Sequence, residues 1–114
     1  MTILETVDKC RVAEDCVLDY PFGPDWAVMR HGEGGKVYAL VYLREGITRL
    51  NLKADPADVV VLSATFASIS VGYHMNKRHW LTVTMDGTVP DDLVDRLIAE
   101  SYRLTLPRAN KRDR

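Results

Sequence analysis

The sequence predicts an α+β domain, in which an antiparallel sheet of about four or five strands carries helices on one of its faces. Segments with helical periodicity or helix caps alternate with short β-branched segments in the order helix, three strands, helix, strand, helix. Glycine-containing turns join the first three strands, and such short connections allow only antiparallel neighbours. Each predicted helix has one apolar face, which it buries most simply against the same side of the sheet. The other side of the sheet is then expected to be partly open.

The size and charge of the chain fit a single domain. Its 114 residues can bury one hydrophobic core, and we expect the folded domain over residues 1–106 and a basic, flexible tail over residues 107–114. The formal net charge of −1 argues against binding nucleic acid through overall charge alone. A nucleic-acid binder with this composition needs a local basic face.

The cysteines and the hydropathy of the chain indicate its compartment. Cys10 and Cys16 do not form a C-x-x-C pair and have no second pair, which argues against a disulfide framework or a thiolate zinc site. No apolar run approaches the roughly 20 residues that a membrane span requires, and the N-terminus lacks the basic and apolar regions of a signal peptide. We therefore expect a cytoplasmic protein with no membrane partner. The oligomeric state is open, with a monomer preferred.

The first helix is predicted over residues 2–14. Thr2 and Glu5 have the spacing of a capping box, and apolar residues recur at helical spacing after them. Cys10 falls on the apolar side of this helix and is expected to be a buried small hydrophobe. Cys16 lies just beyond the helix and is expected to be a free thiol.

An irregular, aromatic-rich loop is predicted over residues 19–26, because two prolines and a glycine interrupt it. Its aromatic side chains are Tyr20, Phe22 and Trp26. They could plug one end of the core or line a pocket. We favour the plug, because a loop this apolar is costly to leave in water.

Three strands follow, predicted over residues 27–31, 36–43 and 47–53. The third strand has two distinct sides, since side chains alternate along a strand. One side carries Thr48, Leu50 and Leu52. The opposite side carries Arg49, Asn51 and Lys53, and one of the two sides should face the core while the other faces water or a partner.

The second half of the chain contains two helices and one strand. An Asp-Pro start predicts a helix over residues 55–65, although three consecutive valines in it would also suit a strand. A short connection is predicted over residues 66–71 and a strand over residues 80–85. The last helix is predicted over residues 90–103, from its acidic start and its apolar stripe.

Residues 72–80, with the sequence G-Y-H-M-N-K-R-H-W, are the densest group of binding and reactive side chains in the chain. As a nucleic-acid site, Lys77 and Arg78 can neutralise phosphates and Asn76 can hydrogen-bond a base edge. Tyr73 or Trp80 can stack on an unpaired base. The predicted nucleic-acid-binding residues are Lys77, Arg78, His79, His74, Asn76 and Trp80, extended by Arg49 and Lys53 on the open face of the sheet.

The same stretch makes a poor active site. His74 and His79 are five residues apart, with no serine or cysteine nucleophile at a recognised spacing and no H-E-x-x-H motif. We therefore expect no enzyme activity, no catalytic residue, no metal and no cofactor. Two other interpretations stay open. In the first, the stretch only braces a loop against the sheet. In the second, a small-molecule or protein ligand binds in a pocket between the Tyr20–Trp26 loop and the His74–Trp80 loop.

Four stretches resemble the MmcQ/YjbR family: Y-P-F-G-P at residues 20–24, V-Y-A-L at 37–40, L-N-L-K-A-D-P at 50–56, and the stretch at 72–80. The closing V-P-D-D at residues 89–92 fits as well, so the match follows nearly the whole chain in order. The resemblance implies a frataxin-like (CyaY-like) α+β arrangement. It also implies a small bacterial protein of poorly defined role, described for the family as DNA-binding through a double wing of hairpins. DNA is therefore the partner expected first, and the pocket ligand is the alternative.

Two positions depart from the family pattern. Members usually have proline before the Gly-Tyr-His, where this chain has Val71, and asparagine after the His-Trp, where this chain has Leu81. The first change is expected to loosen the start of the loop. The second is expected to remove a polar group from the binding site.

Overall fold

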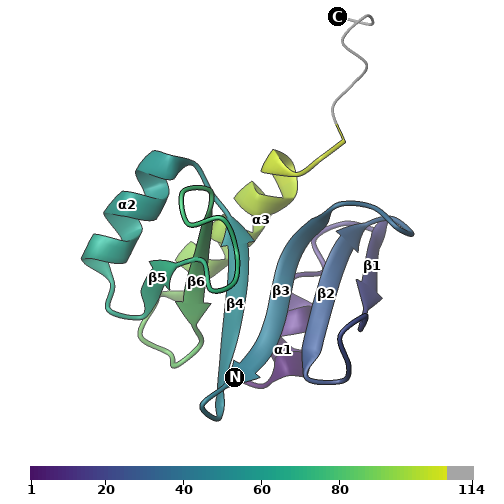
Figure 1. Ribbon diagram of the computed structural model, residues 1–114, viewed down its shortest axis with the longest axis horizontal. Helices are drawn as coiled ribbons and strands as arrows, with labels where there is room; N and C mark the ends of the chain where they lie inside the picture. Colours follow the sequence, from purple (N-terminus) through teal and green to yellow (C-terminus); the bar gives the residue numbers. More distant parts are fainter. Residues whose placement is uncertain (108–114) are drawn as a thin grey trace, which may run out of the picture.

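The computed structural model describes residues 1–107 and has the predicted α+β architecture (Figure 1). The predicted basic tail, apart from Pro107, lies outside these residues. Along the chain the elements are α1 (Ile3–Lys9), β1 (Cys16–Asp19), β2 (Trp26–His31), β3 (Val37–Arg44), β4 (Ile47–Lys53), α2 (Pro56–Thr65), β5 (Ile69–Val71), β6 (Trp80–Thr84) and α3 (Asp91–Leu104).

The strands form one antiparallel sheet in the order β1-β2-β3-β4-β6-β5. The antiparallel prediction is confirmed, but the expected number of strands was too low because β1 and β5 were not predicted as strands. These two strands have four and three residues and form the two edges of the sheet. Strands this short, with one face or edge in water, do not show the alternation that identifies longer strands.

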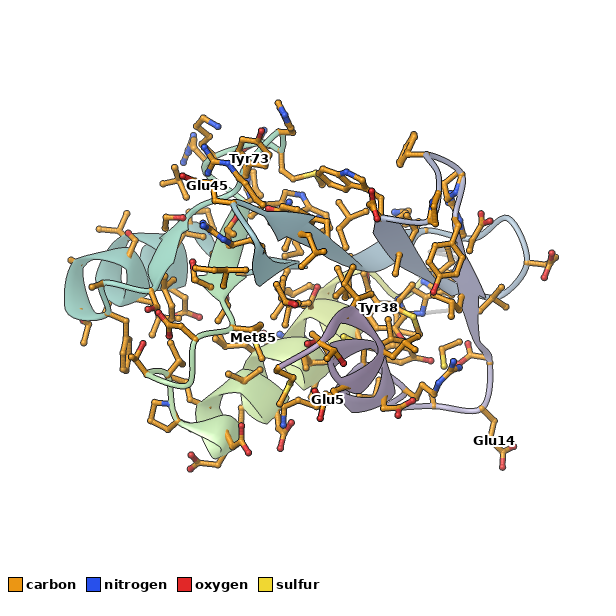
Figure 2. The ribbon with its side chains drawn as sticks, turned by 90° about the horizontal axis from the view of Figure 1, so that it is seen from below. Glu5, Glu14, Tyr38, Glu45, Tyr73 and Met85 are labelled. Carbon is orange, nitrogen blue, oxygen red and sulfur yellow. The ribbon has the colours of Figure 1, made fainter. Side chains whose placement is uncertain are left out.

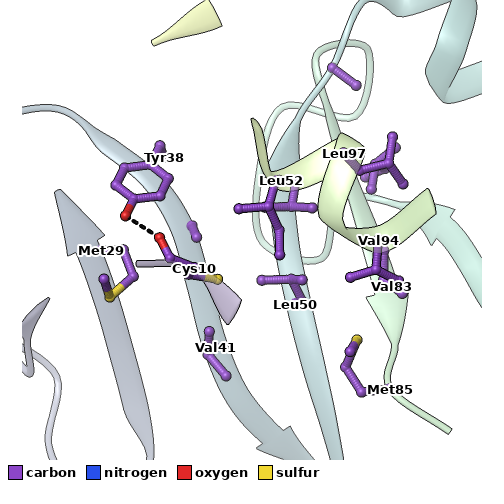
Figure 3. Packing of buried hydrophobic residues seen from close by; sticks show 14 of the residues in the cluster. Cys10, Met29, Tyr38, Val41, Leu50, Leu52, Val83, Met85, Val94 and Leu97 are labelled. Carbon is purple, nitrogen blue, oxygen red and sulfur yellow. Dashed lines mark hydrogen bonds between the residues drawn. The ribbon is translucent and has the colours of Figure 1, made fainter. Parts of the chain in front are cut away.

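Helices α1 and α3 pack on one face of the sheet, behind it in Figure 1 and below it in Figure 2. The main core lies between them and the sheet, where Leu50, Leu52, Leu81 and Ile98 are fully buried. Figure 3 shows this packing. Helix α2 lies beside the β5 edge and contributes the buried Val59 to the same core. The prediction that helices share one face of the sheet is therefore confirmed for α1 and α3.

Helix α1 is shorter than predicted and ends at Lys9, not at residue 14. The predicted capping box between Thr2 and Glu5 is present. The carbonyl of Cys10 accepts a hydrogen bond of 2.5 Å from the Tyr38 hydroxyl (Figure 3). A continued helix would instead use this carbonyl for the N–H four residues later. Cys10 itself is fully buried, as expected.

Helix α2 begins at Pro56 and ends at Thr65, so the Asp-Pro start outweighed the strand preference of the valine run, although the Asp55 side chain makes no capping hydrogen bond. Only one of the three valines is buried. Val60 and Val61 are 68% and 59% exposed. An exposed valine costs a helix little, because its helix propensity is less favourable than that of alanine by only about 0.5 kcal/mol.

A β-bulge between β2 and β3 divides the aromatic residues between the two faces of the sheet. Met29 pairs with Ala39 and Arg30 pairs with Val37, so Tyr38 has no partner in the ladder. The extra residue turns Tyr38 into the helix-side core. The bulge thereby leaves Arg30 and Val37 on the opposite face.

His31 is a buried histidine at the end of β2, 7% exposed. Its Nε2 lies 2.8 Å from the Thr105 hydroxyl, and that hydroxyl donates its own proton to the Ser101 carbonyl at 2.7 Å. Nε2 must therefore carry the ring proton, which leaves Nδ1 as a bare acceptor. Nδ1 has no hydrogen-bond partner within residues 1–107.

We predict that the fold loses stability between pH 7 and pH 5 because of His31. Burial lowers the pKa of His31 below its usual 6.5, so in this range the unfolded chain binds the extra proton first. The stabilisation is present above about pH 6.5 and is lost as the pH falls, at up to about 1.4 kcal/mol per pH unit. Hydrogen bonds from Ser68 and Thr88 hold the pKa of Asp86 at about 2, so that carboxylate does not titrate in this range.

Urea unfolding at a series of pH values measures this slope. His31→Gln is expected to flatten it, because the amide can still donate to Thr105 but does not titrate. His79→Gln changes an exposed histidine and is the matched control, which should keep the wild-type slope. An unchanged slope in His31→Gln would contradict the assignment.

Candidate functional site

The loop of residues 72–79 lies across the face of the sheet opposite to α1 and α3. In Figure 2, Tyr73 and Glu45 lie on one side of the sheet, and Tyr38 and Met85 lie on the other. The face expected to be partly open is therefore largely covered near its centre. It has an apolar cluster of its own around Val28, Leu40 and Tyr42.

Asn51 of β4 fixes the start of this loop to the sheet. Its side chain is fully buried, and its Oδ1 accepts hydrogen bonds from the Tyr42 and Thr82 hydroxyls, each at 2.7 Å. Its Nδ2 donates to the Tyr73 carbonyl at 2.9 Å. The Tyr73 N–H in turn donates to the Thr82 hydroxyl at 2.9 Å. Both backbone polar groups of Tyr73 are thus held by one buried network, and Asn51 does not face water as its position among charged neighbours suggested.

The alternate positions Arg49, Asn51 and Lys53 of β4 share this face with Trp80, Thr82 and Thr84 of β6. The register pairs Arg49 with Thr84, Asn51 with Thr82 and Lys53 with Trp80. Arg49 is not free for an external partner, because its side chain is only 15% exposed and its Nη2 lies 3.4 Å from Glu45 Oε1. Its Nε is buried with no acceptor within residues 1–107.

The rings of Trp26, Tyr42 and Tyr73 form a stack on this face, and the His74 ring contacts its end at a tilt. Trp26 lies on Tyr42 with ring centroids 4.0 Å apart and planes 7° apart. Tyr42 is followed by Tyr73 at 5.9 Å, and Tyr73 by His74 at 3.9 Å. The guanidinium carbon of Arg44 lies 4.2 Å from the centre of the Tyr73 ring. Such stacks fix the ring planes and leave a rigid apolar surface.

A pocket of about 410 Å³ opens beside this stack. Its floor comes from β2 and β3, and its walls come from the 22–26 segment and the 73–75 segment. It is lined by Phe22, Trp26, Val28, Arg30, Val37, Leu40, Tyr73, His74 and Met75. A volume of several hundred Å³ with mostly apolar and aromatic lining is typical of small-molecule sites.

The aromatic loop lines this pocket instead of plugging the main core, so the favoured interpretation of that loop was wrong. Phe22 is 72% exposed, and Trp26 packs on the second apolar cluster. Gly23, with φ of 103°, turns the chain outward between them. Trp26 finds apolar partners on the second face of the sheet, which the sequence pattern had predicted to face water.

The predicted binding residues of the 72–80 stretch are not brought together at one site. His74 lines the pocket, whereas Lys77 and Arg78 line a separate hollow of about 430 Å³ against α2. The Asn76 side chain accepts from the Arg78 N–H at 2.9 Å and so shapes the turn. The remaining residues that line the second hollow are Pro56, Ala57, Val59, Val60, Ser63 and Val71.

The backbone carbonyls of His79 and Trp80 hold the base of the loop. The His79 carbonyl accepts the Ala54 N–H at 2.9 Å, and the Trp80 carbonyl accepts the Gly72 N–H at 2.8 Å. Both contacts close the loop at its base. Lys77 donates to the Gly72 carbonyl at 3.1 Å and is otherwise exposed.

Leu81 does not lie in the candidate site, so the expected loss of a polar group there was wrong. It is fully buried in the helix-side core, on the face of β6 opposite to Trp80. Val71, the other departure, lies at the end of β5 and is 43% exposed.

Few of the cations near the loop have acidic partners. Within residues 1–107, no carboxylate lies within 4.0 Å of a charged nitrogen of Arg44, Lys53, Lys77 or Arg78. Arg30 differs, because its Nε lies 3.3 Å from Asp19 Oδ2.

The described residues contain no group of three histidine, cysteine or acidic side chains placed to hold a metal ion. No helix in the same part of the chain has the length and apolarity to cross a bilayer.

Most of the chain matches the model of a known protein family. The model of the YjbR family matches residues 13–104. The chain belongs to the YjbR family. It is 36% identical over 96 residues to the uncharacterised protein YbdF of Escherichia coli O157:H7, covering 84% of this chain and 77% of that protein. The uncharacterised protein YyaQ of Bacillus subtilis is 33% identical over 99 residues, covering 76% of this chain and 83% of YyaQ.

Solved structures of related proteins share the fold of this YjbR-family chain. A Deinococcus radiodurans protein with the domain DUF419 is similar with a TM-score of 0.84 and 35% identity, over 99% of this chain and 85% of that one. A Pseudomonas syringae protein is similar with a TM-score of 0.79 and 31% identity, over 92% of this chain and 99% of that one.

Several residues of the pocket were not among the predicted site residues of the YjbR-family chain. Arg30, Tyr42 and Asn51 are the most important of them, because they line or hold the pocket. The sequence did contain a signal for this. Leu40 and Tyr42 alternate with Ala39 and Val41, so β3 is apolar on both sides and predicts two covered faces.

Proposed function

We propose that this YjbR-family chain is a binding module whose ligand is a small, largely apolar or aromatic molecule. The observation that supports the proposal best is the aromatic pocket of about 410 Å³ between the 22–26 and 73–75 segments. Its outer wall is a loop that a buried asparagine ties to the sheet at Tyr73. A wall held in this way gives a preformed site, which lowers the entropic cost of binding.

The cost of the exposed aromatic residues also supports ligand binding. Phe22 is 72% exposed at the rim, and Trp26 is only half-buried beneath it. Apolar surface left in water costs about 25 cal/mol per Å², and a ligand that covers it recovers this free energy. Within residues 1–107, the lining includes an imidazole, a guanidinium and a phenol but no thiol or aliphatic hydroxyl. This set suits recognition better than covalent catalysis.

We predict that Phe22→Ala and Trp26→Ala each weaken the binding of indole, a neutral aromatic probe, by about fivefold. Each change removes an aromatic contact with a bound ring, and such contacts contribute on the order of 1 kcal/mol. Ligand-observed NMR titration of the full chain measures the dissociation constants. Phe22 is exposed, so its replacement tests the pocket without disturbing the core.

Leu43→Ala is the matched control for these variants. Leu43 is another exposed apolar residue, 46% exposed, and it does not line the pocket. It should leave the affinity for indole unchanged. Equal affinities in Phe22→Ala, Trp26→Ala and the wild type would contradict the pocket as the site.

DNA binding is a second candidate function, supported by the exposed cations of the loop. Lys77 and Arg78 extend from a turn and have no carboxylate within 4.0 Å in the described part of the chain. Lys53 lies on the same face as the loop and is the register partner of Trp80. These side chains would contact phosphates, with no sequence readout assigned to them.

We predict for this candidate that duplex DNA binds in about 50 mM salt and that Lys77→Ala/Arg78→Ala weakens it. Losing two phosphate contacts should reduce the slope of log affinity against log salt by about 1.8. A fluorescence anisotropy titration at several salt concentrations measures the slope. The control Lys36→Ala/Arg96→Ala removes the same charge elsewhere on the surface. The candidate fails if no binding occurs at about 50 mM salt, or if both double variants behave alike.

A further inference from the structure

The geometry points to a narrower ligand class for the pocket: planar aromatic molecules that carry one carboxylate, which Arg30 recognises. This inference rests on the proposed function of the pocket. It adds the charge and the shape of the ligand, which the apolar lining by itself does not specify.

Arg30 is held in place at one end of the pocket. It lies on β2 on the same side as Trp26 and Val28, and its side chain is 23% exposed. Its Nε donates to Asp19 Oδ2 at 3.3 Å, and its Nη1 donates to the Gly35 carbonyl at 3.2 Å. These contacts use two of the five guanidinium N–H groups. The other three have no acceptor within residues 1–107 and are available to a ligand.

The charge balance of the pocket favours a ligand with a single negative charge. Among the residues that the structure describes, Arg30 is the only permanently charged one that lines it, and no carboxylate does. Asp19 contacts the guanidinium from outside the lining and is itself 47% exposed, so water screens part of its charge and Arg30 keeps a net attraction for an anion. Apolar walls strengthen the attraction between a guanidinium and a bound anion. One cation matches one carboxylate, which a guanidinium binds with two parallel hydrogen bonds.

The aromatic stack favours a flat ligand. Tyr42 covers one face of the Trp26 indole, with planes 7° apart, and so fixes the plane of the ring that lines the pocket. Tyr73 is fixed in turn by its contact with the tilted His74 ring and by its hydrogen-bonded backbone. Rigid ring surfaces bind planar partners with little loss of side-chain entropy. A volume of about 410 Å³ suits a ligand of one or two rings.

The test compares indole-3-acetate with indole-3-acetamide, which has nearly the same shape without the charge. We expect the wild-type chain to bind the acetate about tenfold more tightly than the acetamide. Arg30→Gln should abolish this preference and leave the acetamide affinity within about twofold of the wild type. Ligand-observed NMR titrations of the full chain measure both affinities, and the unfolding midpoint of each variant shows whether it is folded.

Asp19→Asn provides an independent variant with the opposite expected result. It removes the competing carboxylate but keeps the guanidinium, so the acetate should bind about threefold more tightly while the acetamide is unaffected. This variant keeps the test decisive if Arg30→Gln does not fold. An unchanged affinity for the acetate in Asp19→Asn would overturn the role of Arg30.

The outcomes separate the inference from the proposed function. If acetate and acetamide bind the wild type equally, the carboxylate preference is overturned while the aromatic pocket stands. If neither compound binds at millimolar concentration, both the pocket function and this inference are overturned. Tighter binding of the acetate that Arg30→Gln leaves unchanged would also overturn the inference, because another cation would then be responsible.

Discussion

Replacing Asn51 with alanine is expected to lower the free energy of unfolding by about 3 kcal/mol and to free the 72–79 loop from the sheet. The change leaves the Tyr42 hydroxyl, the Thr82 hydroxyl and the Tyr73 carbonyl without their shared partner. Each is part of a buried network, where an unpaired polar group costs about 1–3 kcal/mol. Denaturant unfolding measures the loss, and hydrogen exchange of the amides of residues 73–79 reports the loosening of the loop.

Asn76→Ala is the matched control, since Asn76 is an exposed asparagine in the same loop. Its side chain accepts one local hydrogen bond, from the Arg78 N–H. Its replacement should cost less than about 1 kcal/mol and should leave the Tyr73 amide protected. Similar losses in the two variants would show that Asn51 does not hold the loop.

Replacing Gly72 with alanine is expected to destabilise the fold by about 2 kcal/mol. A Cβ atom at this position would lie 2.7 Å from the Trp80 Cβ and 3.0 Å from the Trp80 carbonyl oxygen. Both neighbours belong to the paired strand β6, so they cannot move without disturbing the sheet. The Gly72 N–H also donates to that same carbonyl at 2.8 Å, and a shift would weaken this bond. Thermal and denaturant unfolding measure the effect.

The Gly72 variant should also weaken ligand binding, because the added atom would lie 3.1 Å from the Cβ of Met75 in the pocket wall. Ser70→Ala, at an exposed position of the adjacent strand, is the control. It should change the free energy of unfolding by less than about 0.5 kcal/mol. A Gly72→Ala variant as stable as Ser70→Ala would contradict the close approach of the loop to Trp80.

The elements that the sequence predicted well have strong local signals. Helix α2 begins at an Asp-Pro pair, and the capping box of α1 is present. The end of α1 could not be predicted, because it depends on the Tyr38 hydroxyl, a partner 28 residues away. The same limitation applies to the bulge at Tyr38, which moves one aromatic ring from one face to the other.

The candidate site was predicted in part. The alternative of a pocket between the two aromatic loops named the correct segments, but it missed Arg30 and Asn51. Asn51 alternates with Arg49 and Lys53, which gave it the pattern of a solvent-facing residue. Its burial depends on the 72–79 loop folding over it, a tertiary contact that strand alternation does not contain. The concentration of functional groups at residues 72–80 likewise did not show that Lys77 and His74 face different hollows.

An NMR titration of the isotope-labelled full chain with indole tests the pocket most directly, because amide shifts report where the ligand binds. We expect the largest shifts at the amides of Trp26, Val28, Leu40 and residues 73–75, together with the indole N–H of Trp26. Shifts centred on Lys77 and Arg78, or no saturable shift at millimolar indole, would contradict a ligand site between the 22–26 and 73–75 segments.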